Sequence, residues 1–296
     1  IRIQRETGSA LLYDASACGS IPVIRNLEEY YDNDLLTSIR GILNGSSNFI
    51  LSRIFNHGES YNIALKKAQD LGFAESNPAF DVMGFDALYK LIILTVHGFG
   101  TYIHPDDAFC SGIHNLSKYD IRYAQEQGKK IKLVASLRKL DNDNFTIFVL
   151  PTLVNSDDYI YNVEDEFNGV VIEGAYYDKQ FMFGKGAGGF PTGSAVLSDI
   201  SARFHNYRYE YKKLNFFTPP AYTTDVTLEL FIRYHDMVDL SIFDIYELVE
   251  RYNGPEHRWV IAKVKLSTLI KVKDLIPKLN LFLAFTGNLD FKSGNL

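Results

Sequence analysis

The chain has 296 residues, of which 46% are hydrophobic and 14% aromatic, which is enough for one large domain or two smaller ones with their own cores. Its 36 acidic and 30 basic residues give a formal net charge of −6, and no run of Lys or Arg is longer than a pair, so nucleic-acid binding is disfavoured. The apolar stretch at residues 91–99 is far shorter than the ~20 residues needed to cross a bilayer. We therefore expect neither a nucleic-acid partner nor a membrane partner.

The first residues, IRIQRETGSALLYDAS, contain no apolar signal-peptide core and no initiator Met. We therefore expect the chain to be the middle of a longer protein. The two cysteines, Cys18 and Cys110, are too few for a disulfide framework and lack a CxxC spacing. This cysteine usage favours a reducing compartment, and the predicted localisation is cytoplasmic.

Apolar and polar patches alternate over residues 11–140 in a way that favours an α/β or α+β domain. A charged helical patch at residues 24–31 is followed by a strand-like run at residues 35–43. Asn44-Gly45 predicts a turn after this strand, and Ser46 or Ser47 is the predicted N-cap of the following helix.

Two further helices are predicted before residue 101. The first has Ser60 as its N-cap and Gly72 as its left-handed end. The second runs through residues 77–100, and at 100° per residue one of its faces carries Val82, Asp86, Lys90, Ile93 and His97. Nearly every other position from Leu88 onward is apolar, so we expect this helix to be buried.

The middle of the chain combines one helix with several strands. The helix is predicted at residues 116–130, and the strand runs lie at residues 131–140, 146–154 and 169–184. The predicted fold class is therefore α+β, with a multistranded sheet and helices packed on one of its faces.

The last stretch starts after residues 216–220, whose two prolines are typical of a linker. It is predicted to contain strands at 225–235, 258–266 and 281–287 and helices at 241–253, capped by Ser241, and 267–280. This β-α-β-α-β order resembles a ferredoxin-like module of the ACT type. We therefore divide the chain into domains at 1–215 and 216–296.

A glycine-rich loop at residues 184–189 satisfies the GxGxxG pattern, follows a strand-like run and precedes a helix that Pro191 is predicted to open. Such a loop can cradle a pyrophosphate at a helix N-terminus. The helix is followed by the polar segment 206–213 instead of a second parallel strand, so a dinucleotide-binding βαβ unit is disfavoured. A close backbone approach to a ligand and a turn that requires glycine for steric reasons both remain open.

Three separated segments, at residues 13–24, 41–91 and 184–200, together resemble homoserine dehydrogenase over roughly residues 11–205. The resemblance implies NAD(P)-dependent interconversion of L-homoserine and L-aspartate 4-semialdehyde, in the pathway to threonine, methionine and isoleucine. In that family the nucleotide-binding domain lies N-terminal to the segment that matches residues 13–22. We therefore expect this chain to lack that domain and to be inactive alone, with the choice between NAD and NADP left open.

The resemblance also assigns substrate residues. Glu75 matches the carboxylate that receives the substrate ammonium group, Asp86 and Lys90 match the catalytic pair beside the reacting hydroxyl or aldehyde, and Asp81 matches an acidic residue near the substrate. An Asp and a Lys at i and i+4 in an apolar helix are costly to bury unless they are paired, although an ordinary surface pair has the same spacing. His97 is expected to be a hydrogen-bonded core residue and not a catalytic base.

Cofactor and metal residues follow from the same resemblance. The family segment beside the nicotinamide is matched by Gly186, Ala187 and Gly188, and a second cofactor-proximal loop by Cys18, Gly19 and Ser20. Some members hold a sodium ion, and the matching positions are Asp14, Ala17, Gly19 and Ile21. Oxygen ligands of this kind suit hard cations, but Asp14 replaces the usual Glu.

The C-terminal module resembles the ACT domain whose threonine binding gives feedback inhibition, but it lacks the usual Pro-Gly turn, and a packing module without a ligand is an equal alternative. The family implies a homodimer formed through a sheet face. Two other functions remain open: a non-catalytic assembly and amino-acid-sensing module, and a different dehydrogenase with the same substrate domain.

Overall fold

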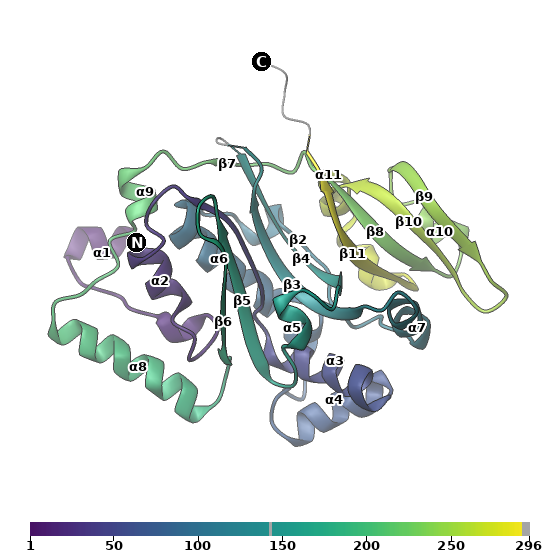
Figure 1. Cartoon of the computed structure of the whole chain (residues 1–296), viewed down its shortest axis with the longest axis horizontal. Coiled ribbons are helices and arrows are strands. Elements are labelled where there is room, and N and C mark those ends of the chain that lie inside the picture. Colours follow the sequence, from purple (N-terminus) through teal and green to yellow (C-terminus); the bar gives the residue numbers. More distant parts are fainter. Residues whose placement is uncertain (142–143, 292–296) are drawn as a thin grey trace, which may run out of the picture.

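The computed structural model describes residues 1–141 and 144–291, and their strands form one mixed sheet (Figure 1). The strands are β1 Leu36–Ile42, β2 Phe109–Cys110, β3 Lys130–Lys139, β4 Asn144–Val154, β5 Phe167–Gly174, β6 Asp178–Lys185, β7 Ala221–Tyr222, β8 Thr227–Tyr234, β9 Ile245–Asn253, β10 Arg258–Lys265 and β11 Leu281–Asp290. Their order is β6-β5-β1-β3-β4-β11-β8-β10-β9, with β2 and β7 pairing with β4. Along this order neighbours are antiparallel except β4 and β11, which are parallel where Thr152 meets Phe285.

The helices connect and cover these strands. The α-helices are α1 Arg2–Thr7, α2 Val23–Glu29, α3 Gly45–His57, α4 Tyr61–Asp70, α5 Ala79–Val82, α6 Phe85–Phe99, α7 Lys118–Glu126, α8 Gly189–Phe204, α9 Lys212–Phe216, α10 Met237–Leu240 and α11 Leu266–Val272. Short 3₁₀ turns are η1 Asp14–Ser16, η2 Pro105–Asp107, η3 Tyr159–Asn162 and η4 Ile276–Lys278. Among the described residues no helix is long and apolar enough to span a bilayer.

One face of the N-terminal part of the sheet carries the main core. Ile131, Leu133 and Leu137 of β3 point into a cluster shared with α2, α3 and α6, whereas Val134 points into a smaller cluster beside η3. This separation follows from the two-residue period of a strand. The predicted α+β class, with helices on one sheet face, is confirmed for this part of the chain.

The C-terminal module differs from its predicted element order. Residues 245–253 form strand β9, antiparallel to β10, so the predicted helix at 241–253 is wrong. Apolar residues at 245, 248, 249 and 252 have helical spacing, but β9 is an exposed edge strand with two register shifts against β10. The observed order is β-α-β-β-α-β, in which α10 is a helix of only 4 residues.

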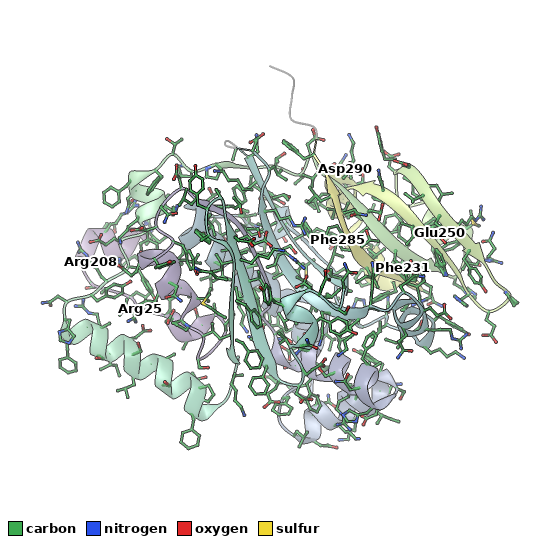
Figure 2. All side chains as sticks on the ribbon, viewed as in Figure 1. Arg25, Arg208, Phe231, Glu250, Phe285 and Asp290 are labelled. Atoms are coloured by element: carbon green, nitrogen blue, oxygen red, sulfur yellow. The ribbon has the colours of Figure 1, made fainter. Side chains whose placement is uncertain are left out.

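The two predicted domains are joined more closely than a linker would require. Residues 216–220 lead into β7, which pairs with β4. Buried Arg233 of β8 donates through Nε to Asp120 of α7 at 2.8 Å, and Tyr123 of α7 stacks on Phe231 with ring centroids 4.4 Å apart. Figure 2 shows Phe231 on β8 within this end of the molecule and Glu250 on the outer strand β9. The division at residue 215 remains a prediction.

Three helix boundaries differ from those predicted. The predicted helix at 77–100 is two helices, α5 and α6, because Gly84 between them adopts a left-handed φ of 88°. The N-cap of α3 is Asn44, whose side chain accepts the Ser47 N–H, and not Ser46 or Ser47. Helix α8 begins at Gly189, two residues before Pro191, which therefore does not open it.

Candidate active site

Helix α6 presents an ion pair that is only partly accessible. Lys90 Nζ lies 2.7 Å from Asp86 Oδ2, and their side chains are 19% and 22% exposed. The exposed pair of the same i,i+4 spacing on α4, Lys66 and Asp70, is 69% and 60% exposed. Lys90 Nζ also donates to the Leu43 carbonyl at 2.9 Å. The Asp86–Lys90 pair is therefore not an ordinary surface pair.

A second carboxylate lies beside this pair. Asn44 Nδ2 donates to Asp81 Oδ1 at 2.7 Å and to Asp86 Oδ2 at 2.8 Å. Burial raises the pKa of Asp81, the nearby Asp86 charge raises it further, and the Asn44 hydrogen bond opposes this rise. Asn44 was predicted only as a turn residue and not as part of this site, although its place between a strand and a helix is typical of an N-cap.

The predicted substrate residues line one cavity of about 680 Å³. Asp81, Asp86 and Lys90 form part of its wall, and exposed Glu75 lies on the loop that leads to α5. The glycine loop contributes Gly186, Ala187 and Gly188. Glu166, in the turn just before β5, also lines the cavity and was not predicted, because no motif marks it.

The glycine loop lies between β6 and α8. Strand β6 is antiparallel to β5, so the loop is not part of a βαβ unit, and the disfavoured dinucleotide-fold reading is wrong. A Cβ at Gly186 would lie 2.3 Å from the Asn168 Cγ, so glycine is required there for steric reasons. Gly188 has a φ of 114°, and a Cβ at Gly189 would meet nothing within 4 Å. The loop therefore requires glycine at position 186 for steric reasons, whereas its backbone near Gly189 is uncovered.

The predicted loop of Cys18, Gly19 and Ser20 flanks this turn and does not line the cavity. Ser20 N–H donates to the Lys185 carbonyl at 3.1 Å, and a Cβ at Gly19 would lie 2.5 Å from the Gly186 carbonyl oxygen. Burial raises the pKa of the Cys18 thiol to about 12. This loop therefore packs against the backbone of the glycine turn. Cys18 is not a thiolate nucleophile.

The predicted sodium positions, Asp14, Ala17, Gly19 and Ile21, lie on one turn before α2. Two of them already accept hydrogen bonds: Asp14 Oδ1 from the Arg25 N–H at 3.1 Å, and the Ile21 carbonyl from the Val23 N–H at 2.8 Å. Within residues 1–141 and 144–291 no group of three or more His, Cys, Asp or Glu side chains is arranged to hold a metal. The predicted set combines one carboxylate with backbone carbonyls, so sodium at this turn stays a prediction.

His97 is buried, as expected, and fully engaged. Its Nδ1 lies 2.5 Å from Glu28 Oε1 and its Nε2 lies 2.7 Å from the Tyr13 hydroxyl. Glu28 also accepts the backbone N–H groups of Glu210 and Tyr211. This network holds the segment after α8 against the core and does not reach the cavity lined by Asp86 and Lys90.

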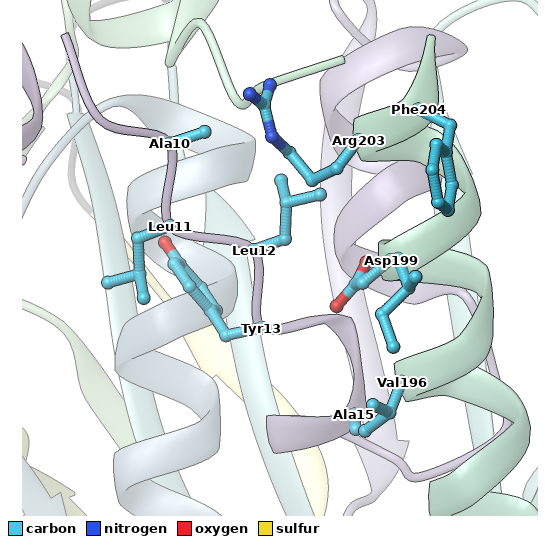
Figure 3. A pocket seen from close by; sticks show the side chains of 10 residues that line it. Ala10, Leu11, Leu12, Tyr13, Ala15, Val196, Asp199, Arg203 and Phe204 are labelled. Carbon is cyan, nitrogen blue, oxygen red and sulfur yellow. The ribbon is translucent and has the colours of Figure 1, made fainter. Parts of the chain in front are cut away.

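A separate, mostly apolar cavity of about 580 Å³ lies between residues 10–15 and α8. Figure 3 shows Val196, Asp199 and Arg203 of α8 on one side and Leu11, Leu12 and Tyr13 on the other. Helix α8 buries only Ala195 and Asp199 and exposes several large apolar side chains, namely Phe190, Leu197, Ile200 and Phe204. None of the predicted substrate residues lies in this cavity.

Comparison with known proteins gives a consistent result. The family model for homoserine dehydrogenase matches residues 22–201. A homoserine dehydrogenase of Bacillus subtilis is 35% identical over 245 residues, covering 81% of this chain and 56% of the relative, and one of Lactococcus lactis is 38% identical, covering 64% and 44%. The chain thus spans about half the length of the curated relatives it matches.

Solved structures agree with these relatives. A homoserine dehydrogenase from Thiobacillus denitrificans has a TM-score of 0.75 at 28% identity and covers 96% of this chain and 72% of its own. A hyperthermophilic archaeal homoserine dehydrogenase in complex with NADPH has a TM-score of 0.59 at 26% identity, covering 70% of this chain and 60% of its own. This chain belongs to the homoserine dehydrogenase family.

Proposed function

We propose that this chain forms the substrate-binding part of an enzyme that interconverts L-homoserine and L-aspartate 4-semialdehyde with NAD or NADP. The observation that carries the proposal is the partly buried Asp86–Lys90 pair inside a cavity closed by the glycine loop. Family membership supports the same chemistry. The residues with direct roles are Glu75, Asp81, Asp86 and Lys90.

Lys90 is the proton donor in this proposal. An ammonium group has three N–H bonds, and Asp86 and the Leu43 carbonyl accept two of them. The third is available to the oxygen of the aldehyde, which takes up a proton as its carbon receives a hydride. In the reverse direction the hydroxyl proton passes to the uncharged amine. Glu75, at the exposed side of the cavity, receives the substrate ammonium group.

A nicotinamide cofactor, when bound, supplies or accepts the hydride. The glycine loop fits such a group because the backbone near Gly189 is open and begins the 16-residue helix α8. Asn168, whose buried side chain packs directly under Gly186, fixes the position of this loop. Gly186, Ala187 and Gly188 would hold the nicotinamide end.

The apolar cavity beside α8 suggests what further polypeptide the activity requires. Monomeric proteins rarely leave a contiguous apolar face uncovered, and the longer relatives contain polypeptide that this chain does not match. We propose that a nucleotide-binding domain covers α8 in the longer protein. The isolated chain is therefore expected to bind homoserine but not to reduce NAD or NADP in its presence.

Calorimetric titration of the 296-residue chain with L-homoserine tests the proposal. Lys90→Ala is expected to weaken binding about 10- to 100-fold, as for the loss of a hydrogen bond to a charged group. Lys66→Ala removes an exposed pair of the same spacing and is expected to leave affinity unchanged. Equal affinity of wild type and Lys90→Ala would refute the assignment of Lys90. Homoserine-dependent reduction of NAD or NADP by the chain alone would refute the need for a further domain.

Other parts of the proposal concern partners and location. The β-α-β-β-α-β order of the C-terminal module supports an ACT-like unit, with threonine as its proposed ligand. Exposed aromatic side chains on β6, Phe181 and Phe183, support a homodimer through this sheet. We place the protein in the cytoplasm and the domain division at residue 215. The alternative, a non-catalytic assembly and sensing module, predicts no homoserine binding in the same titration.

A further inference from the structure

Asn44 links helix α3 to both carboxylates of the substrate cavity and is only 5% exposed. Its Oδ1 accepts the Ser47 N–H at 2.8 Å, while its Nδ2 donates to Asp81 and Asp86. A backbone N–H can only donate, so the amide oxygen must face α3 and the NH₂ group must face the carboxylates. The helix that Asn44 caps therefore fixes the orientation of its side chain.

The two carboxylates are held at short range. Their hydrogen-bonded oxygens lie 2.7 and 2.8 Å from the same nitrogen, so they are at most about 5.5 Å apart, the sum of these distances. Carboxylates this close repel each other, and a proton is readily taken up by one of them. An NH₂ group with a hydrogen for each carboxylate offsets this repulsion without a formal charge.

Few basic side chains lie near enough to offset the negative charge of the two carboxylates. Glu75 and Glu166 line the same cavity, and Lys90 is the one cationic side chain in its described wall. Lys185 pairs with Glu166 at 3.2 Å. Burial raises the pKa of Asp81 and the Asp86 charge adds to this rise, while hydrogen bonds from Asn44 and Ser46 and the charge of Lys90 lower it. The cavity wall therefore carries an excess of negative charge.

We propose that Asn44 is a positioning residue that keeps Asp81 ionised and holds Asp86 in place, so that Lys90 stays paired with Asp86 and keeps one N–H bond directed at the substrate. This inference rests on the proposed function, in which Asp86 and Lys90 contact the substrate oxygen. If Asn44 were absent, a proton shared between the carboxylates would weaken the hold of Asp86 on Lys90.

Three substitutions separate the helix cap from the carboxylate contact. Asn44→Ser retains a capping oxygen and loses the NH₂ group, Asn44→Asp retains the cap and adds a third carboxylate, and Asn44→Ala loses both. We expect the melting temperatures of Asn44→Ser and Asn44→Asp to exceed that of Asn44→Ala. Asn33→Ser, in the turn before β1, is the control for an Asn-to-Ser change outside the cavity.

The decisive measurement is an NMR titration of the Asp carboxyl carbons in the 296-residue chain. The titration midpoint of Asp81 is expected to rise by about one pH unit in Asn44→Ser and further in Asn44→Asp, and to stay unchanged in Asn33→Ser. In calorimetry, the lowest pH at which homoserine still binds should rise together with the Asp81 midpoint. If the Asp81 midpoint matches wild type in both Asn44→Ser and Asn44→Asp, the inference is wrong. If wild type binds no homoserine at any pH, the proposed function fails, while the NMR titration still decides the role of Asn44.

Discussion

Arg233→Met tests how the four C-terminal strands are held to the rest of the chain. Arg233 Nε donates to both Asp120 oxygens, at 2.8 and 3.0 Å, and Nη2 donates to the Asn115 carbonyl at 2.7 Å. Met occupies a similar volume but leaves the buried carboxylate with the two donors of Ser117. Removing one partner of a buried ion pair costs about 3–5 kcal/mol, and we expect a loss of about 4 kcal/mol in the free energy of unfolding.

Urea denaturation followed by tryptophan fluorescence measures this loss. The sequence contains 1 Trp, and Trp259 pairs directly with Arg233 across β8 and β10. Lys265→Met is the control, because its exposed contact with Asp225 is long, at 3.9 Å, and is worth less than about 1 kcal/mol. Adding Asp120→Asn to Arg233→Met removes the unpaired charge and should recover part of the loss. A loss no greater than that of Lys265→Met would refute the reasoning.

Two further substitutions, each with a control substitution, test the glycine loop and a buried lysine. Gly186→Ala places a Cβ 2.3 Å from Asn168, so we expect lower thermal stability and weaker homoserine binding in calorimetry. Gly193→Ala, in open space on α8, should instead raise stability by about 0.5–1 kcal/mol. Burial lowers the pKa of Lys213 from 10.5 to about 8, so the charged form destabilises the fold below pH 8 and this cost disappears as the pH approaches 10.5. Lys213→Met should therefore raise the free energy of unfolding by about 1–3 kcal/mol at pH 7 and by little at pH 10. The control Lys212→Met removes ion pairs with Glu29 and Asp32 and should give no such gain. An equal effect of Lys213→Met at both pH values would contradict the lowered pKa of Lys213.

Part of the cavity lined by Asp86 and Lys90 could be predicted from local patterns, whereas Glu75 and Asp81 were predicted from the family resemblance. Asp86 and Lys90 have the spacing of one helix face, and the glycine loop is a short motif, so each can be recognised without knowledge of the tertiary structure. Asn44 and Glu166 join the cavity through contacts between distant segments. Asn44 is 37 positions from Asp81, and nothing in its neighbourhood specifies that contact.

The errors in the predicted fold have specific physical causes. Residues 245–253 carry apolar side chains at a helical spacing, but pairing with β10 outweighs this local pattern. The segment 206–213 reads as polar, yet Tyr209 and Tyr211 are buried against His97 and Tyr13. Tyr carries both a polar hydroxyl and a large apolar ring, so sequence composition alone does not indicate which of them determines its position.

Helix α6 is bounded at each end by a glycine in a left-handed conformation that has no room for a side chain. A Cβ at Gly84 would lie 2.9 Å from the Cys110 Sγ, and one at Gly100 would lie 2.6 Å from the backbone of Lys213. The helix can therefore neither be extended nor slide along its axis without displacing its neighbours. Since one inserted or deleted residue rotates the following side chains by about 100°, length changes between Gly84 and Lys90 would turn Lys90 away from the cavity. For protein engineering, the length of this segment is fixed, and substitutions are best confined to its exposed side chains, Phe85 and Tyr89.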